Sequence, residues 1–182
     1  MWYVLIFILV LLIDQVTKIL ASMYAVESPI TVINGFLEIT YCENRDGMMG
    51  LFDKMQNSQI IFLIATCVIL IGIFIYLGVS KNRGKWRNMT LALVLSGAFG
   101  NFIDRILTFT DGGYVRDMIH TIINIGGVER FPFIFNVADM ALVVGAIMLL
   151  LDILFIDKDA LFKCQKKNTT SEKAKETDGE TA

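Results

Sequence analysis

Five polar residues of kinds that are rare inside membrane helices interrupt two apolar runs of this sequence. They are Asn101, Asp104 and Arg105 in SGAFGNFIDRIL, and Asn136 and Asp139 in FNVADMALVVGAIMLLL. On insertion scales a charge at the centre of a membrane helix costs about 2.5–3.5 kcal/mol. Such residues usually face a bundle interior or a water-filled cavity, so the pattern predicts a polar site between helices.

Another carboxylate, Asp117, lies in the polar segment before Asp139. If this segment folds back over the start of the next apolar run, Asp117 faces Asp139. Like charges a few Å apart do not both ionise readily, so such a pair shares one proton. One carboxylate then activates water and the protonated one polarises a carbonyl, which is the chemistry of aspartic peptidases.

Composition places the chain in a membrane. Of its 182 residues 55% are hydrophobic, and the mean hydropathy is +0.61; both values exceed those of a soluble domain. A net charge of −2 gives no reason to expect nucleic acid as a partner. With one histidine, three cysteines and no CxxC spacing, we expect no zinc site of the common kinds and no other cofactor.

Four segments have the length of a membrane span, about 20 mostly apolar residues. We expect spans at about 2–24, 60–79, 89–109 and 133–156, which form a four-helix membrane domain over residues 1–158. The polar residues 159–182 are expected to be a disordered cytoplasmic tail.

Lysine and arginine counts give the orientation. Ten lie in the link between spans two and three and in the tail, against five in the other two connections. The positive-inside rule therefore predicts cytoplasmic termini. On the outer side, Asn34-Gly35 between two β-branched and aromatic runs predicts a hairpin, and the segment from Tyr114 to Ile125 predicts further extended structure.

The helical rise places the polar residues at one depth. At 1.5 Å per residue, Asp14 lies about 18 Å along span one and Asp104 about 24 Å along span three, both counted from the cytoplasm. Span four runs back inward, so its polar residues lie in its first two turns. The outer leaflet should hold them all: Asp14, Lys18, Asn101, Asp104, Arg105, Asp117, Asn136 and Asp139.

Simpler readings stay open at this point. Asp14 and Lys18, four residues apart, could be an internal ion pair that stabilises span one. Arg105 could be an interfacial anchor with Asp104 as its partner. The whole protein could be a small proton-coupled transporter or a non-catalytic scaffold, although apolar cytoplasmic halves disfavour transport.

Four motifs in order resemble those of the signal peptidase II family, the lipoprotein signal peptidases. They are DQVTK (Asp14–Lys18), GAFGNFIDR (Gly97–Arg105), GYVRDM (Gly113–Met118) and FNVADM (Phe135–Met140). The resemblance implies a bacterial aspartyl endopeptidase with a four-helix bundle, a small extracytoplasmic β-cradle and a helix-bearing loop. It further implies cell-membrane localisation, inhibition by globomycin, and a monomer whose partners are membrane lipid and a diacylglyceryl-modified prolipoprotein, cleaved before the lipidated cysteine.

By motif, the resemblance assigns a catalytic dyad of Asp117 and Asp139. It implies that six further polar residues support the dyad: Asp14, Lys18, Asn101, Asp104, Arg105 and Asn136. The family's Asn-x-Gly element reads ENRDGMMG here, with two residues between Asn44 and Gly47. The sequence leaves open whether Asn44 keeps the role of the family's asparagine or whether Arg45 or Asp46 takes its place. It also leaves open that the protein is a catalytically inactive relative.

Overall fold

Four long apolar helices dominate the computed structural model, which describes residues 2–45, 58–79, 84–125, 128–129 and 133–156. The helices are α1 (Trp2–Tyr24), α2 (Ser58–Val79), α3 (Lys85–Leu107) and α4 (Val137–Leu151). Each is long and apolar enough to cross a membrane, α4 when counted on to Phe155. The chain is therefore a multi-pass membrane protein, and the predicted mostly helical fold with a small β element is confirmed.

The chain divides into two compact units, Met1–Leu149 and Leu150–Ala182. In the second unit the described residues are the end of α4 and the π-helical segment η3 (Asp152–Ile156). The sheet and all residues of the predicted site that the structure describes belong to the first unit.

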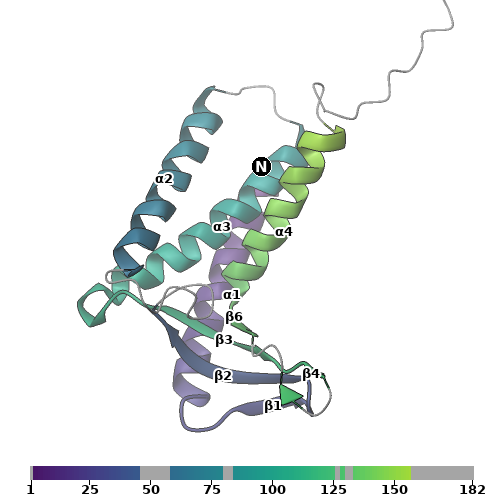
Figure 1. Cartoon of the computed structure of the whole chain (residues 1–182). Helices are drawn as coiled ribbons and strands as arrows, with labels where there is room; N and C mark the ends of the chain where they lie inside the picture. Colours follow the sequence, from purple (N-terminus) through teal and green to yellow (C-terminus); the bar gives the residue numbers. More distant parts are fainter. Residues whose placement is uncertain (1, 46–57, 80–83, 126–127, 130–132, 157–182) are drawn as a thin grey trace, which may run out of the picture. The chain divides into compact units, whose positions relative to one another are not determined.

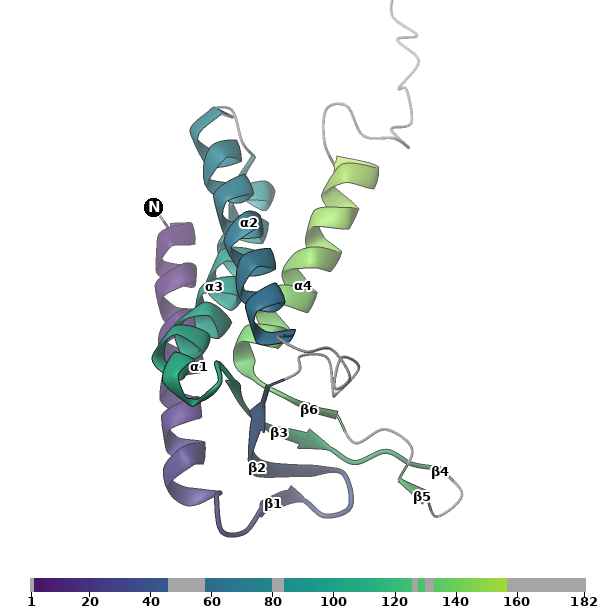
Figure 2. The ribbon, with the colours of Figure 1, turned by 60° about the vertical axis from the view of Figure 1, so that its left-hand side comes forward.

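Helix α3 is the central helix of the first unit (Figures 1 and 2). Half of its apolar span is buried, whereas the corresponding value for α2 is 6%. Close packing against α4 depends on small residues: a Cβ placed on Gly145 would lie 2.7 Å from Cγ2 of Val94. The outward faces of α1 and α2 carry large exposed aliphatic side chains such as Leu9 and Val68, which suits contact with lipid.

A four-stranded antiparallel sheet lies at the end of the helices where α1 and α3 finish and α4 begins (Figure 2). Its order is β1 (Ile30–Ile33), β2 (Leu37–Asn44), β3 (Val115–Thr121) and β6 (Phe133–Phe135). The strands β4 (Asn124–Ile125) and β5 (Val128–Glu129) form a separate ribbon. The hairpin predicted at Asn34-Gly35 is present, and Gly35 has the positive φ, 70°, that its turn requires.

The expected start of span four is wrong by four residues. Phe133–Phe135 form strand β6, which pairs with β3, and helix α4 begins only at Val137. Hydropathy cannot separate a short apolar strand from the first turn of an apolar helix, which explains the difference. Helix α3 begins before the expected start of span three, at Lys85, because the basic residues that precede the apolar run are also helical.

Candidate functional site

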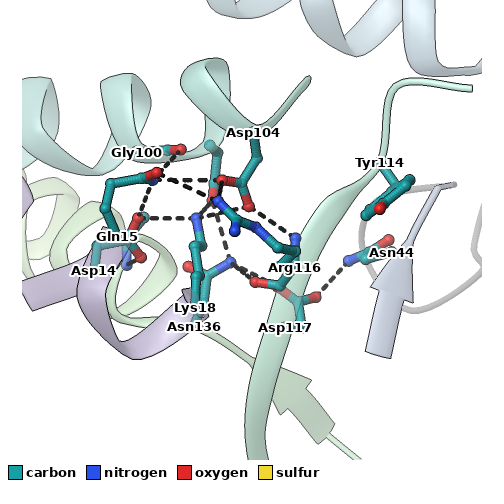
Figure 3. Close-up of polar contacts among 12 residues, drawn as sticks. Asp14, Gln15, Lys18, Asn44, Gly100, Asp104, Tyr114, Arg116, Asp117 and Asn136 are labelled. Atoms are coloured by element: carbon teal, nitrogen blue, oxygen red, sulfur yellow. Dashed lines mark hydrogen bonds and ion pairs between the residues drawn. The ribbon is translucent and has the colours of Figure 1, made fainter. Parts of the chain in front are cut away.

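The polar residues expected at one depth do converge. Lys18 Nζ lies 2.9 Å from Oδ2 of Asp14 and 3.3 Å from Oδ2 of Asp104, and all three side chains are fully buried (Figure 3). The predicted pairing of Asp14 with Lys18 is confirmed. Asp14 also accepts a 2.8 Å hydrogen bond from the backbone N–H of Ala138, which ties α1 to the start of α4.

Asp104 does not pair with its neighbour Arg105. Its Oδ1 accepts a 2.7 Å bond from the guanidinium of Arg116, a residue of β3. Consecutive residues of a helix point in different directions, which explains why the pairing of Asp104 with Arg105, one of the alternatives left open above, is not found. Arg105 instead lies over the ring of Phe62, 5.5 Å from its centre, and its buried Nε has no hydrogen-bond partner in the part of the chain that the structure describes.

Asn136 and Asp139 form the N-terminal cap of α4. The side-chain oxygen of Asn136 accepts a 2.8 Å bond from the backbone N–H of Asp139, and Oδ2 of Asp139 accepts a 3.2 Å bond from the backbone N–H of Asn136. This reciprocal pair is a capping box with an aspartate at the third helical position. The spacing of three residues therefore fixes the Asp139 carboxylate at the helix N-terminus, where the helix dipole favours a negative charge.

Two amides connect this cap to the rest of the site. Asn101 donates a 2.8 Å bond to Oδ1 of Asp139, and its oxygen accepts from Lys18 Nζ at 3.1 Å. The amide nitrogen of Asn136 donates to the Asn101 oxygen at 3.1 Å and to Oδ1 of Asp117 at 2.6 Å. Asn136 therefore contacts both carboxylates of the predicted dyad.

Asp117 is 1% exposed, and its second oxygen accepts a 2.8 Å bond from the side chain of Asn44 (Figure 3). Asn44 thus reaches Asp117 despite the extra residue that follows it in the sequence. Burial and the nearby charge of Asp139 raise the pKa of Asp117 to about 7, against the hydrogen bonds of Asn44 and Asn136. Gly47, also expected to support the site, lies outside the described residues.

A cavity of about 480 Å³ opens beside these groups. Asp139, Asn101, Asn44 and Arg105 supply its polar wall. The remaining wall is mostly apolar and comes from α2, α4 and the sheet, with side chains that include Phe62, Ile69, Val115, Phe135, Leu142 and Val143. The cavity can hold an apolar chain that carries a polar bond to the carboxylates.

Two residues of the network were absent from the predicted site. Gln15 donates to Asp14 at 3.1 Å and to the backbone oxygen of Gly100 at 3.1 Å. Arg116 binds Asp104 through its side chain and also through its backbone N–H, at 2.9 Å. Two signals could have identified them. Both residues are next to a predicted site residue in the sequence, and the buried negative charge of Asp104 requires a nearby cation.

The fold and the site together define a class: a multi-pass membrane protein with a buried cluster of carboxylates, cations and amides at one end of its helices. A sequence model of the family described as signal peptidase (SPase) II matches residues 6–155. The chain belongs to this family, and it is therefore a peptidase.

Named relatives and a solved structure agree with this assignment. A lipoprotein signal peptidase of Caldanaerobacter subterraneus is 39% identical over 141 residues, 77% of this chain and 87% of that protein. One from Staphylococcus aureus strain JH9 is 36% identical over 165 residues, 90% and 93% of the two chains. A solved bacterial membrane enzyme superposes with a TM-score of 0.72 at 34% identity, covering 91% of this chain and 93% of the other.

Proposed function

We propose that the protein is an intramembrane aspartyl endopeptidase that removes the signal peptide from diacylglyceryl-modified prolipoproteins. It cleaves before the lipidated cysteine and uses Asp117, Asp139 and a water molecule. The observation that carries this proposal is that Asn136 contacts both carboxylates beside an apolar cavity whose wall includes Asp139. Its side-chain nitrogen donates to Oδ1 of Asp117, and its backbone N–H donates to Oδ2 of Asp139.

The environment of Asp117 suits the acid of such a pair. With a pKa of about 7, the Asp117 carboxyl retains its proton up to neutral pH. Asp139 is oriented by Asn101 and by the helix cap, lines the cavity, and is the base. This division of roles follows the general rule that two interacting carboxyls share one proton.

The proposed reaction has two steps. In the first, Asp139 takes a proton from water, the water oxygen bonds to the peptide carbon, and Asp117 gives its proton to the carbonyl oxygen. In the second, Asp139 returns its proton to the leaving nitrogen, the C–N bond breaks, and Asp117 recovers a proton from the geminal diol. Both carboxyls then have their starting protonation.

Arg105 is the group placed to bind the peptide carbonyl. Arg105 lines the cavity and is 9% exposed, and its buried Nε has no hydrogen-bond partner among the described residues, so at least one of its donors is unused there. A fixed cation near a developing oxyanion stabilises the transition state more than the ground state.

The cavity suits a substrate that arrives within the membrane. Its apolar wall combines α2 residues Phe62 and Ile69 with α4 residues Leu142 and Val143, so an apolar signal helix can reach the carboxylates between α2 and α4. The named relatives are lipoprotein signal peptidases, which supports a prolipoprotein substrate. We place the site at the outer leaflet of a bacterial cell membrane, with both termini in the cytoplasm.

A gel-shift cleavage assay tests the proposal. The purified protein is incubated in detergent with a diacylglyceryl-modified prolipoprotein, and wild type is compared with Asp117→Asn and Asp139→Asn. We expect cleavage by wild type and a loss of at least a thousandfold in each variant, because neither amide can exchange the required proton.

Thermal melts of each variant serve as the control for folding. Near-full activity in one folded variant would remove that residue from the dyad. A wild-type protein that does not process a substrate cleaved by a verified family member would contradict the proposal as a whole.

A further inference from the structure

Asp104 binds one residue of β3 at two points. Its Oδ1 accepts the side chain of Arg116 at 2.7 Å, and its Oδ2 accepts the backbone N–H of the same residue at 2.9 Å (Figure 3). Asp104 is itself fixed from α1, because Lys18 lies 3.3 Å from Oδ2 and Gln15 donates to Oδ1 at 3.4 Å. The carboxylate therefore attaches β3 directly to α1 and α3.

The sheet needs such an attachment at this point, because its register changes beside Asp117. Ile39 pairs with Ile119, but the next pair is Cys42 with Asp117, so β2 has one residue more than β3 between them. A bulge of this kind bends the strand and interrupts the hydrogen-bonded ladder. The ladder alone therefore fixes Asp117 less firmly than a regular strand would.

Successive side chains of a strand point to opposite faces. The side chain of Arg116 lies toward Asp104 and Gln15, and that of Asp117 lies toward Asn136 and Asn44 (Figure 3). A slip of one residue would exchange the two faces and remove Asp117 from the site. The Arg116–Asp104 contacts oppose this slip.

Arg116 also balances the charge of the site. When the two dyad carboxyls share one proton, three negative charges and three positive charges remain in this cluster. The negative charges are Asp14, Asp104 and one charge on the pair of Asp117 and Asp139, and the positive charges are Lys18, Arg105 and Arg116. Among the described residues, loss of Arg116 leaves Asp104 with a single paired cation, Lys18, which also pairs with Asp14.

We propose that Arg116 is a positioning residue of the peptidase: its double contact with Asp104 holds the part of β3 that lies opposite the β2 bulge, so that Asp117 faces Asn136 and Asp139. Arg116 does not line the cavity, so it acts through Asp117 and not on the substrate. This inference rests on the proposed function and adds to it a residue outside the predicted site.

The experiment measures steady-state cleavage of the diacylglyceryl-prolipoprotein by the full-length protein in detergent, with Arg116→Met and Arg116→Lys compared with wild type. We expect Arg116→Met to lower kcat at least tenfold with KM within twofold of wild type. Arg116→Lys, which keeps a cation for Asp104, should recover at least threefold over Arg116→Met. Lys85→Met, which removes an exposed cation at the first residue of α3, far from the site, is the control and should stay within twofold of wild type.

Each other result counts against the inference. A kcat of Arg116→Met within twofold of wild type, a loss confined to KM, or no recovery by lysine overturns it. If Arg116→Met does not fold, Arg116→Gln replaces it and is judged by the same kcat and KM criteria. If neither variant folds, the contact serves stability alone, and the inference is overturned. Inactive wild-type protein contradicts the proposed function and is distinguishable from all of these results.

Discussion

At the scale of single residues, the two carboxylates of the proposed dyad differ in their surroundings. Asp117 is almost fully buried on a strand, whereas Asp139 is half-buried at a helix N-terminus and lines the cavity. Asn136 contacts both carboxylates, that of Asp117 through its side-chain nitrogen and that of Asp139 through its backbone N–H, so one residue sets their relative position. Because their surroundings differ, the pH dependence of stability and of activity can test the role proposed for Asp117.

The raised pKa of Asp117 predicts a loss of stability with rising pH. Because the folded pKa, about 7, lies above the ordinary carboxyl value, the folded state binds more protons between about pH 4 and pH 7. Stability supplied by this group is complete below pH 4 and is lost as pH rises to 7, with a limiting slope of about 1.4 kcal/mol per pH unit. Thermal melts in detergent at pH 5, 6, 7 and 8 should show a steeper fall for wild type than for Asp117→Asn. Equal pH dependence in both proteins would contradict the assignment.

Asn44 predicts a shift in the pH–rate profile. Its hydrogen bond favours the charged form of Asp117, so Asn44→Ala should raise the pKa of Asp117 further. The alkaline decline of activity should therefore move up by about half a pH unit, the worth of an ordinary hydrogen bond. Cleavage rates measured from pH 5 to pH 9 test this, and a shift to lower pH would be evidence against the Asn44–Asp117 contact.

At the scale of elements, close packing at Gly100 brings α1, α3 and α4 together. A Cβ on Gly100 would lie 2.5 Å from Oδ2 of Asp14 and 2.9 Å from Cβ of Ala138. Three helices therefore meet at a position where only glycine fits without movement. The ion pair of Asp14 with Lys18 depends on this approach.

Gly100→Ala should destabilise the protein by about 1–3 kcal/mol, the usual cost of overpacking, and reduce cleavage. Gly72→Ala in α2 is the matched control, because a Cβ there meets nothing within 4 Å and alanine favours a helix. Thermal melts and cleavage rates of both variants test this: Gly100→Ala should have the lower melting temperature and the lower rate. Equal stability of the two variants would show that α3 can move away at no cost.

Much of this arrangement could be predicted from sequence, for identifiable reasons. Apolar length located the four helices, and Asn34-Gly35 located the first hairpin. Counting residues along each helix placed the polar residues at one depth and so predicted that they meet. This works because ionisable groups in membrane helices almost always face the bundle interior or a water-filled cavity. Two details required coordinates: the start of α4, hidden in a continuous apolar run, and the Arg116 partner of Asp104, which depends on how β3 crosses α3. The Asn136–Asp139 capping box was readable from its spacing of three.

At the scale of the whole molecule, the number of lysines and arginines in the connections predicts which side carries the sheet. Two single cysteines, Glu27→Cys and Lys85→Cys, are introduced into a cysteine-free background. Position 27 follows α1 on the sheet side, position 85 is the first residue of α3 at the opposite end, and both are exposed. A membrane-impermeant maleimide should label Glu27→Cys in intact cells, or in spheroplasts where an outer membrane is present. Lys85→Cys should be labelled only after the membrane is permeabilised. The reverse pattern would invert the proposed topology and place the dyad at the inner leaflet.

The capping box at the start of α4 has a consequence for biosynthesis. On the proposed assignment, one carboxylate of the pair belongs to β3, whereas the other carboxylate and Asn136, which contacts both, belong to the last helix and its N-terminal cap. A chain still leaving the ribosome with only three helices inserted holds Asp117 but has neither partner in place. On this assignment, the growing chain brings both carboxylates of the pair together only after its last helix has formed.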